Sequence, residues 1–309
     1  MKRNAIWKIA LCTTPEAEDA VTELFSTVFG EPASAYADAE TGTVTVAAYC
    51  QTKPPGIAGE QTALSAGISR IRDCGLNVGQ GRVSVRRIRR EDWAESWKRH
   101  FKTITVGRSL LIKPSWVNRR ARKGQAVVVI DPGLSFGTGH HPTTLFCLGE
   151  LAKRRRAGEA QSLLDIGTGS GILAISAAKL GYSPVHAFDF DSEVVRVARS
   201  NARLNSLSRR IQFKQVDLTK LPDRPVQRFS LICANLVSTL LIAEREKVAR
   251  LLRPDGVLVL AGILKSEFLQ VRTAYESVGL CVMASRSEKG WRSGTFVHSH
   301  SRYQPRARH

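Results

Sequence analysis

A glycine-rich turn between an apolar segment and a helical one is the part of this sequence best suited to bind a small molecule. Gly167, Gly169 and Gly171 directly follow the apolar segment 163–166. Glycines allow a tight turn and let backbone N–H groups approach a ligand at the start of a helix. Eighteen residues after Gly171 the next apolar segment ends in Asp189, whose carboxylate can accept both hydroxyl groups of a ribose. The pattern predicts a site for a nucleoside-containing cofactor at the carboxyl ends of parallel strands.

The spacing of these glycines and one acidic residue indicate which cofactor it is. A dinucleotide-binding turn reads GxGxxG, whereas this chain reads GxGxG and has Asp165 just before it. The carboxylate of Asp165 would repel a pyrophosphate but suits an ammonium group. S-adenosylmethionine carries such a group at its methionyl end, so we expect this cofactor. The alternative is a set of tight turns without a ligand.

Asp217 ends the next strand-like segment, 211–217, and allows two interpretations. Its carboxylate could accept a hydrogen bond from the adenine amino group of the cofactor. It could equally cap the next turn of the chain, as aspartates commonly do.

Strand and helix patterns alternate around the cofactor motif from about residue 104 onward. Such alternation predicts a doubly wound, parallel, Rossmann-like α/β sheet with helices on both faces. In the first 90 residues the order β-α-β-β-α-β predicts a small ferredoxin-like α+β domain. We therefore expect a small domain at 1–90, a linker helix at 91–104 with Trp93 and Trp97, and a cofactor-binding domain at 105–309.

The net charge of +19 belongs almost wholly to the second part of the chain. Residues 1–100 carry 13 Lys+Arg against 12 Asp+Glu, whereas residues 101–309 carry 33 against 15, with basic runs at 119–123 and 153–156. Such a surface favours polyanions, with ribosomal RNA as the obvious candidate; alternatively, the charge is solvated and keeps the protein soluble. The nearly neutral first part can approach a basic protein without repulsion, so we expect it to recognise a protein substrate.

No segment approaches the length of a membrane span, and Lys8 interrupts the apolar run near the start that would otherwise resemble a signal peptide. None of the six cysteines forms a CxxC pair, and each lies in or beside an apolar segment. We therefore expect a cytoplasmic protein with buried thiols, without disulfides and without a metal.

Seven segments between residues 91 and 267 form a specific combination. They read DPGLSFGTGHHPTTLFCLGEL (131–151), EDWAESWKRHF (91–101), LLIKPSW (110–116), DIGTGSGILAISAAKLG (165–181), FDFD (188–191), ICANLV (232–237) and LAGILKSE (260–267). Together they resemble the PrmA family of ribosomal protein L11 methyltransferases, which are class I S-adenosylmethionine-dependent enzymes. The resemblance implies methylation of α-amino and lysine ε-amino groups on that large-subunit ribosomal protein.

Carried over by position, the resemblance implies that Thr144, Gly167, Asp189 and Asn235 bind the cofactor. Phe136 belongs to a glycine-rich loop that could close over the methionyl end, or could be a mere connector. The side-chain carbonyl of Asn235 can accept an N–H of the acceptor amine and aim its lone pair at the methyl group. Asn235 is therefore the expected catalytic residue.

Two stretches depart from the family pattern. The family usually has Thr where His140 stands, so we expect His140 to be incidental and His141 to be a structural residue of the turn. After Asn235 the family commonly reads Ile-Leu-Ala-Gly-Pro, whereas this chain reads Leu-Val-Ser-Thr-Leu at 236–240. This stretch borders the expected acceptor pocket and leaves the exact substrate atom open.

Two rival functions deserve comparison. Methyltransferases that act on the amino group of adenine usually have Asn/Asp-Pro-Pro-aromatic at this position, and residues 235–238 lack the prolines and the aromatic platform for a flipped base. The other rival is a non-catalytic ribosome-assembly factor that binds RNA through its basic face. The intact glycine turn and Asp189 argue against a loss of cofactor binding.

Overall fold

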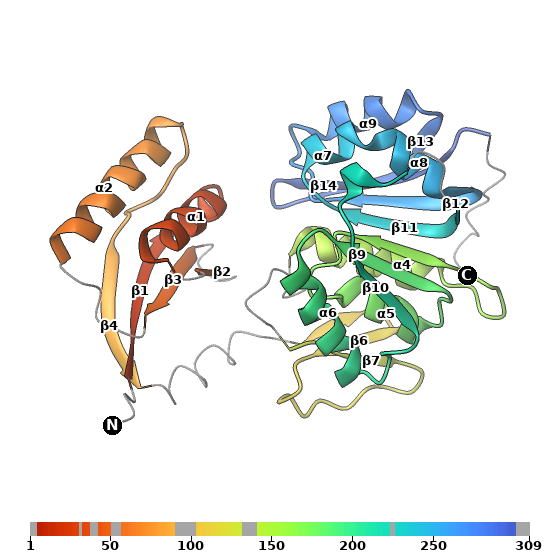
Figure 1. Cartoon of the computed structure of the whole chain (residues 1–309), viewed down its shortest axis with the longest axis horizontal. Helices are drawn as coiled ribbons and strands as arrows, with labels where there is room; N and C mark the ends of the chain where they lie inside the picture. Colours follow the sequence, from red (N-terminus) through yellow and green to blue (C-terminus); the bar gives the residue numbers. More distant parts are fainter. Residues whose placement is uncertain are drawn as a thin grey trace. The chain divides into compact units, whose positions relative to one another are not determined.

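The computed structural model describes residues 5–30, 33–37, 43–50, 57–89, 103–131, 141–222 and 226–300 of the chain. The chain divides into two units, Met1–Lys102 and Thr103–His309, which are described one at a time and are shown in Figure 1. Of the linker helix expected at 91–104, only the last two residues are described, and Ile104 already belongs to a strand.

The first unit is a four-stranded antiparallel sheet with two helices. Its elements are β1 (Ala5–Thr13), α1 (Glu18–Phe29), β2 (Ser34–Ala37), β3 (Val44–Cys50), α2 (Ile57–Asp73) and β4 (Val83–Arg89). The sheet order is β2-β3-β1-β4, and every pairing is antiparallel. This is the split βαβ arrangement of a ferredoxin-like fold, as the order of the elements predicts.

Helix α1 shows how the sequence produces this unit. Its apolar residues lie on one face of the helix. Val21 and Phe25 are completely buried, and Leu24 and Val28 pack partly buried against the same core. Burial of each such side chain contributes about 1.5–3 kcal/mol. The helix ends at Gly30, whose φ of 62° lies in the left-handed region that a residue without Cβ adopts at little cost.

The second unit contains a small sheet and a large one. The small sheet has the order β5-β6-β7, from β5 (Ile104–Val106), β6 (Leu110–Lys113) and β7 (Ala126–Val129). The large sheet has the order β10-β9-β8-β11-β12-β14-β13. Its strands are β8 (Leu163–Ile166), β9 (Val185–Asp189), β10 (Ile211–Gln215), β11 (Phe229–Asn235), β12 (Leu252–Ala261), β13 (Leu280–Glu288) and β14 (Trp291–His298).

Helices cover both faces of the large sheet (Figure 1). One face packs against α4 (Pro142–Arg154), α5 (Ile172–Leu180) and α6 (Ser192–Leu204), and the other against α7 (Ser238–Ala243), α8 (Arg245–Leu251) and α9 (Phe268–Glu276). Along β11, Leu231 and Cys233 point into the first core while Ile232 and Ala234 point into the second. A strand buried on both faces must be apolar at successive positions, which explains the continuous run 231–234. The doubly wound fold is confirmed.

The last two strands differ from the parallel sheet that the sequence predicts. Strands β10, β9, β8, β11 and β12 pair in parallel, whereas β14 pairs antiparallel with both β12 and β13. Lys289 and Gly290 both have positive φ, 47° and 83°, which is typical of a two-residue hairpin turn. The hairpin reverses the chain and places β14 inside the sheet.

The cysteines are less buried than the sequence suggests. Only Cys147 and Cys233 are buried, and Cys12 and Cys74 are exposed. Cys12 lies on β1 of the four-stranded sheet, where side chains alternate between the two faces, and Cys74 follows the last residue of α2. Among the residues described, no helix is long and apolar enough to cross a membrane.

Candidate active site

Three neighbouring parallel strands bring the predicted site residues to one edge of the large sheet. Strand β8 lies between β9 and β11, with Ile166 in register with Phe188 and with Ala234. The residues that follow in each strand are Gly167, Asp189 and Asn235. Because all three strands run in the same direction, these residues lie at the carboxyl edge, where doubly wound sheets bind their ligands.

The glycine turn after β8 is held by the end of β9. Gly167, Gly169 and Gly171 have φ values of 71°, 55° and 81°, which a side chain would strain. The backbone N–H groups of Gly167 and Thr168 both donate to the carbonyl of Phe188 at 3.0 Å. A Cβ on Gly167 would lie 2.5 Å from the Leu236 side chain. The first glycine is therefore required for its backbone conformation, and a side chain there would also displace the end of the Leu236 side chain.

Asp189 joins this turn from the side. It is 8% exposed, and its Oδ2 accepts the N–H of Gly169 at 3.1 Å. Its Oδ1 accepts the N–H of Asp191 at 3.3 Å. A carboxylate oxygen can accept more than one hydrogen bond, so both oxygens retain capacity for hydroxyl donors of a ligand.

Asp165 lies beneath the turn and has no solvent exposure. Its Oδ2 accepts a hydrogen bond from the Thr168 hydroxyl at 2.7 Å and another from the N–H of Ala174 at 3.2 Å. Burial raises the pKa of this carboxyl to about 7, against the opposing effect of these two hydrogen bonds, and the nearby Asp189 raises it further. Within the described part of the chain its Oδ1 is buried without a hydrogen-bond partner. In this structure Asp165 braces the turn against the first turn of α5.

Asn201 is a residue of this site that the sequence analysis missed. It is buried on α6, and its Nδ2 donates to the carbonyl of Ser170 at 2.9 Å. Its Oδ1 accepts the N–H of Asp131, at the end of the segment that leaves β7. A polar residue inside a helix that presents apolar residues to the core was the available signal, since buried amides need partners.

Asp217 follows β10 and caps the short 3₁₀ helix Leu218–Lys220. Its Oδ1 accepts both the N–H and the hydroxyl of Thr219, at 3.0 and 2.8 Å, and these bonds lower the pKa of the carboxyl. The structure thus contains the cap, which was one of the two interpretations. The adenine contact stays a prediction.

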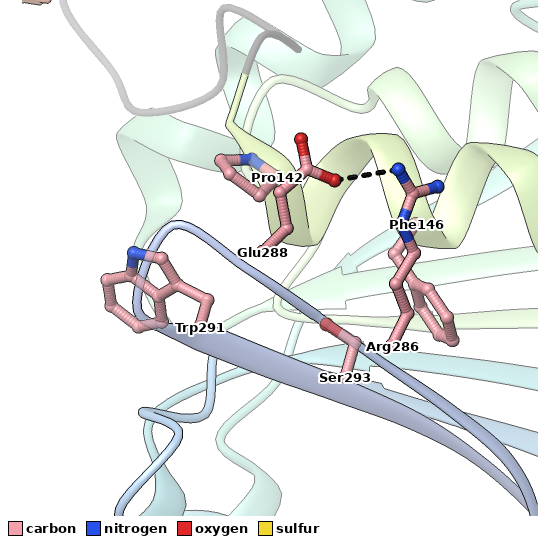
Figure 2. Close-up of a pocket in the computed structure, with 6 residues that line it drawn as sticks. All are labelled: Pro142, Phe146, Arg286, Glu288, Trp291 and Ser293. Atoms are coloured by element: carbon pink, nitrogen blue, oxygen red, sulfur yellow. Dashed lines mark ion pairs between the residues drawn. The ribbon is translucent and has the colours of Figure 1, made fainter. Parts of the chain in front are cut away.

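Thr144 lies in the first turn of α4 and is 6% exposed. The helix begins with the N-cap His141, whose Nδ1 accepts the N–H of Thr143, and the His141 ring packs edge-to-face on Trp291 at 4.8 Å. Figure 2 shows the small hollow beside this turn, lined by Pro142, Phe146, Arg286, Glu288, Trp291 and Ser293. His141 is a structural residue here, as expected from the sequence. Phe136 and His140 lie outside the described residues.

The chain after Asn235 is fixed by a second close approach that the sequence analysis did not identify. The N–H of Leu236 donates to the carbonyl of Ala261 at 3.1 Å. Gly262 has a φ of 80°, and a Cβ there would lie 2.6 Å from the Leu236 carbonyl oxygen. Three residues after Asn235, the Ser238 hydroxyl donates to Glu267 at 2.6 Å. Asn235 is therefore held at the edge by the pairing of β11 with β12 and by the fixed backbone of Leu236 that follows it.

The donor set of this edge fits a ligand with a ribose and an ammonium group better than one with a pyrophosphate. Its acidic groups are Asp189 and the buried Asp165, whose pKa is raised to about 7, and the turn 165–171 contains no cation. Within the described residues the Oδ1 of buried Asp165 has no hydrogen-bond partner, so this atom can accept a hydrogen bond from a donor group of a ligand. Within the described ranges, no group of three or more His, Cys, Asp or Glu could hold a metal ion.

Comparison with known proteins gives one consistent family. Residues 5–298 match the family described as Ribosomal protein L11 methyltransferase (PrmA). Proteins named ribosomal protein L11 methyltransferase are 39% identical over 209 residues in Pelotomaculum thermopropionicum and 41% identical over 206 residues in Trichlorobacter lovleyi. These alignments cover 68% and 65% of this chain and 66% of each relative, so the chain spans about two thirds of the length of the relatives it matches.

A solved structure described as a ribosomal protein L11 methylase from Lactobacillus delbrueckii subsp. bulgaricus has the same fold. It superposes with a TM-score of 0.56 at 28% identity and covers 64% of this chain and 98% of its own. The fold is therefore shared with a solved relative.

Proposed function

Since the chain belongs to the family of ribosomal protein L11 methyltransferases, we propose that it transfers methyl groups from S-adenosylmethionine to amino groups of the large-subunit ribosomal protein L11. The observation that carries this proposal is the cluster at the carboxyl edge, in which the glycine turn, Asp165 and Asp189 are joined by hydrogen bonds. Such a cluster suits a nucleoside with an adjacent cationic tail. Because this substrate is ribosomal, we place the reaction in the cytoplasm.

The chain's own residues would hold the cofactor in a defined order along this edge. Asp189 would accept the two ribose hydroxyls, and the N–H groups of the turn from Gly167 to Gly171 would lie against the methionyl part. Thr144 and Phe136 would close the site from the segment before β8, and Asp217 would lie toward the adenine. When bound, the cofactor supplies an electrophilic methyl group on a sulfonium.

Asn235 would position the acceptor amine. Methyl transfer to nitrogen needs a neutral amine, and at pH 7 a lysine with a pKa of about 10.4 is neutral in only about one molecule in 10³. An α-amino group, with a pKa of about 7.8, is neutral far more often. A positive charge next to a desolvated ammonium lowers the pKa of that ammonium, so water can take the proton. The side-chain carbonyl of Asn235 would then accept the remaining N–H and aim the lone pair.

Residues 1–90 would recognise the protein substrate. This part of the chain is close to neutral, whereas ribosomal proteins are generally basic, so its approach is not opposed by charge. A linker at 91–104 would allow the small domain to present different amines to one fixed methyl group. The basic second unit would contact ribosomal RNA.

The test is transfer of labelled methyl groups from S-adenosylmethionine into purified ribosomal proteins, followed by mass spectrometry of the modified one. Label in L11, lost with Asn235→Ala, supports the proposal. Label in RNA instead would favour the base-methylating alternative, for which residues 235–238 lack the expected Pro-Pro-aromatic sequence. If the protein binds the cofactor but transfers no methyl group to any ribosomal component, the non-catalytic assembly factor would be the favoured alternative.

A further inference from the structure

The two basic runs of the chain have similar composition but different structural roles. In the run 153–156, Arg154 is 5% exposed and pairs with Glu150 at 2.6 Å, and Lys153 lies 3.8 Å from the same carboxylate. Arg156 pairs with Glu159 at 3.2 Å, and the Nε of Arg155 donates to the carbonyl of Leu180 at 3.1 Å. Each cation of this run is thus engaged with its own fold.

The run 119–123 belongs to a segment whose charge the described part of the protein does not neutralise. Between residues 103 and 130 the chain has no Asp or Glu, and its six cations are Arg108, Lys113, Arg119, Arg120, Arg122 and Lys123. All except Lys113 are exposed. Within the residues that the structure describes, none of the six forms an ion pair, whereas the other basic run and several helices carry pairs such as Arg196–Glu193 and Arg272–Glu276. Among the described residues, no ion pair therefore offsets the positive charge of this segment.

Most of these cations lie on the connection between β6 and β7, residues 114–125, which we call the basic arm. Figure 1 shows it at the end of the second unit that lies away from α9 and β13. Hydrogen bonds fix the arm at both ends. Ser115 N–H donates to the carboxylate of Asp131 at 2.7 Å, and the amide of Gln125 donates to the carbonyl of Leu110 at 3.0 Å. Arg119 donates to the hydroxyl of Thr103 at 2.8 Å.

This arrangement differs from a solvated charged face. A face that serves only solubility usually mixes both signs, because like charges repel and destabilise the folded state. Here only one sign is present, and the backbone that carries it is anchored, so little ordering is needed when a partner binds. Exposed guanidinium groups match phosphate geometry with two parallel N–H bonds.

We propose that the basic arm is an RNA-binding surface that contacts backbone phosphates, with Arg120, Arg122 and Lys123 as its main contacts. The inference rests on the proposed function only for the identity of the RNA as ribosomal. It locates RNA binding on the arm and assigns no such role to the run 153–156, whose cations are engaged by Glu150, Glu159 and the carbonyl of Leu180.

The experiment compares the full-length protein with two variants of equal charge. The arm variant replaces Arg120, Arg122 and Lys123 with Gln. The control variant replaces Arg196, Arg250 and Arg272 with Gln; these three pair with helix carboxylates at 2.6, 2.8 and 2.7 Å. Binding of a fluorescein-labelled RNA hairpin is followed by anisotropy across a salt series. Methyl transfer to free L11 and the melting temperature are measured on the same samples.

We expect the arm variant to bind RNA more weakly by tens of fold near ~0.15 M salt, with the slope of log K against log salt smaller by about two. The control variant should nearly keep both its RNA affinity and its salt slope. Methyl transfer to free L11 should be unchanged in both variants. Equal losses in the two variants, or no RNA binding by the unaltered protein, would overturn the proposal. So would an arm variant that keeps RNA binding and loses methyl transfer. RNA binding that depends on the arm, in a protein that does not methylate L11, would refute the proposed function and leave this inference standing.

Discussion

The carboxylate of Asp189 accepts a hydrogen bond from the backbone N–H of Gly169 at 3.1 Å. This bond joins the end of β9 to the turn that follows β8. The side chain expected to hold the ribose of the cofactor therefore also holds the shape of the glycine turn. Replacing it changes a ligand contact and the loop geometry together.

Asp189→Ala should weaken S-adenosylmethionine binding by about 3–6 kcal/mol, because two charge-assisted hydrogen bonds of roughly 1.5–3 kcal/mol each are lost. Asp191→Ala is the matched control, since Asp191 caps α6 by accepting the N–H of Glu193 at 2.8 Å. That variant should lose about 1 kcal/mol of stability and keep its affinity. Isothermal titration calorimetry measures the cofactor affinity of both variants, and urea unfolding measures their stability. Unchanged binding by the Asp189 variant would remove this residue from the cofactor site.

Asn235→Ala should reduce turnover far more than cofactor affinity, because its expected task is to aim the acceptor amine. The measurements are the single-turnover rate of the cofactor-loaded enzyme and the Kd of S-adenosylmethionine. Ser238→Ala serves as control, since Ser238 lies three residues further on and bonds to Glu267. If affinity falls strongly while turnover of the loaded enzyme is unchanged, Asn235 only clamps the cofactor.

Asp165 should make the stability of the protein decrease with rising pH. Burial raises its pKa from 3.8 to about 7, so between these values the folded state holds a proton that the unfolded state has released. This contribution to stability is fully present below the unfolded pKa and is lost as the pH rises through the folded one. The expected slope is about −1.4 kcal/mol of unfolding free energy per pH unit within this window.

The measurement is urea unfolding of the unaltered protein and of Asp165→Asn from pH 4.5 to 7.5. The amide cannot ionise, so the difference in unfolding free energy between the two proteins should shift in favour of the variant as the pH rises. A difference that is constant across this range would mean that Asp165 is ionised throughout.

Gly262→Ala should destabilise the protein more than Gly279→Ala. The two glycines have φ values of 80° and 82°, so the backbone strain of a side chain, about 1–2 kcal/mol, is common to both. At Gly279 nothing lies within 4 Å of an added Cβ, whereas at Gly262 it would meet the Leu236 carbonyl oxygen at 2.6 Å. Denaturant unfolding gives the two losses, and only Gly262→Ala should also lower methyl transfer, because Leu236 follows Asn235. Equal losses would show that Leu236 moves aside freely.

A chain that starts near residue 91 should still bind S-adenosylmethionine, since every cofactor motif lies beyond residue 130. It should lose methylation of intact L11 while it retains slow transfer to a short peptide. The comparison is kcat/KM for protein and for peptide with the whole and the shortened chain. Equal rates on intact L11 would contradict the role proposed for residues 1–90.

The cofactor edge could be predicted from the sequence because its geometry follows from chain direction. Gly167, Asp189 and Asn235 each end a parallel strand, and such ends meet at one edge whatever the rest of the fold does. The side-chain partners were less accessible. The pattern gives the position of a residue along the chain and not the direction of its side chain, so it did not predict that Asp165 lies under the turn and binds Thr168. The contact of Asp165 with an ammonium group stays a prediction.

Charge and strand direction were the other points where the sequence was ambiguous. The basic runs 119–123 and 153–156 have similar sequences. Only the structure shows that Arg154 and Arg156 of the second run form ion pairs with Glu150 and Glu159. Strand β14 reads WRSGTFVH and pairs antiparallel with both of its neighbours, β12 and β13. Its reversal depends on the two-residue turn at Lys289 and Gly290, which the sequence analysis did not single out.

The interior position of β14 has a consequence for the order in which the chain can fold during its synthesis. Strands β8 to β12 can pair with one another as they are synthesised. In contrast, β13 pairs only with β14, and the outer edge of β12 stays unpaired until β14 has been synthesised. The first unit, in contrast, has its whole sheet by Arg89. Unpaired strand edges are templates for association with other chains. Until residue 298 has been added, the growing protein therefore presents two such edges to its neighbours.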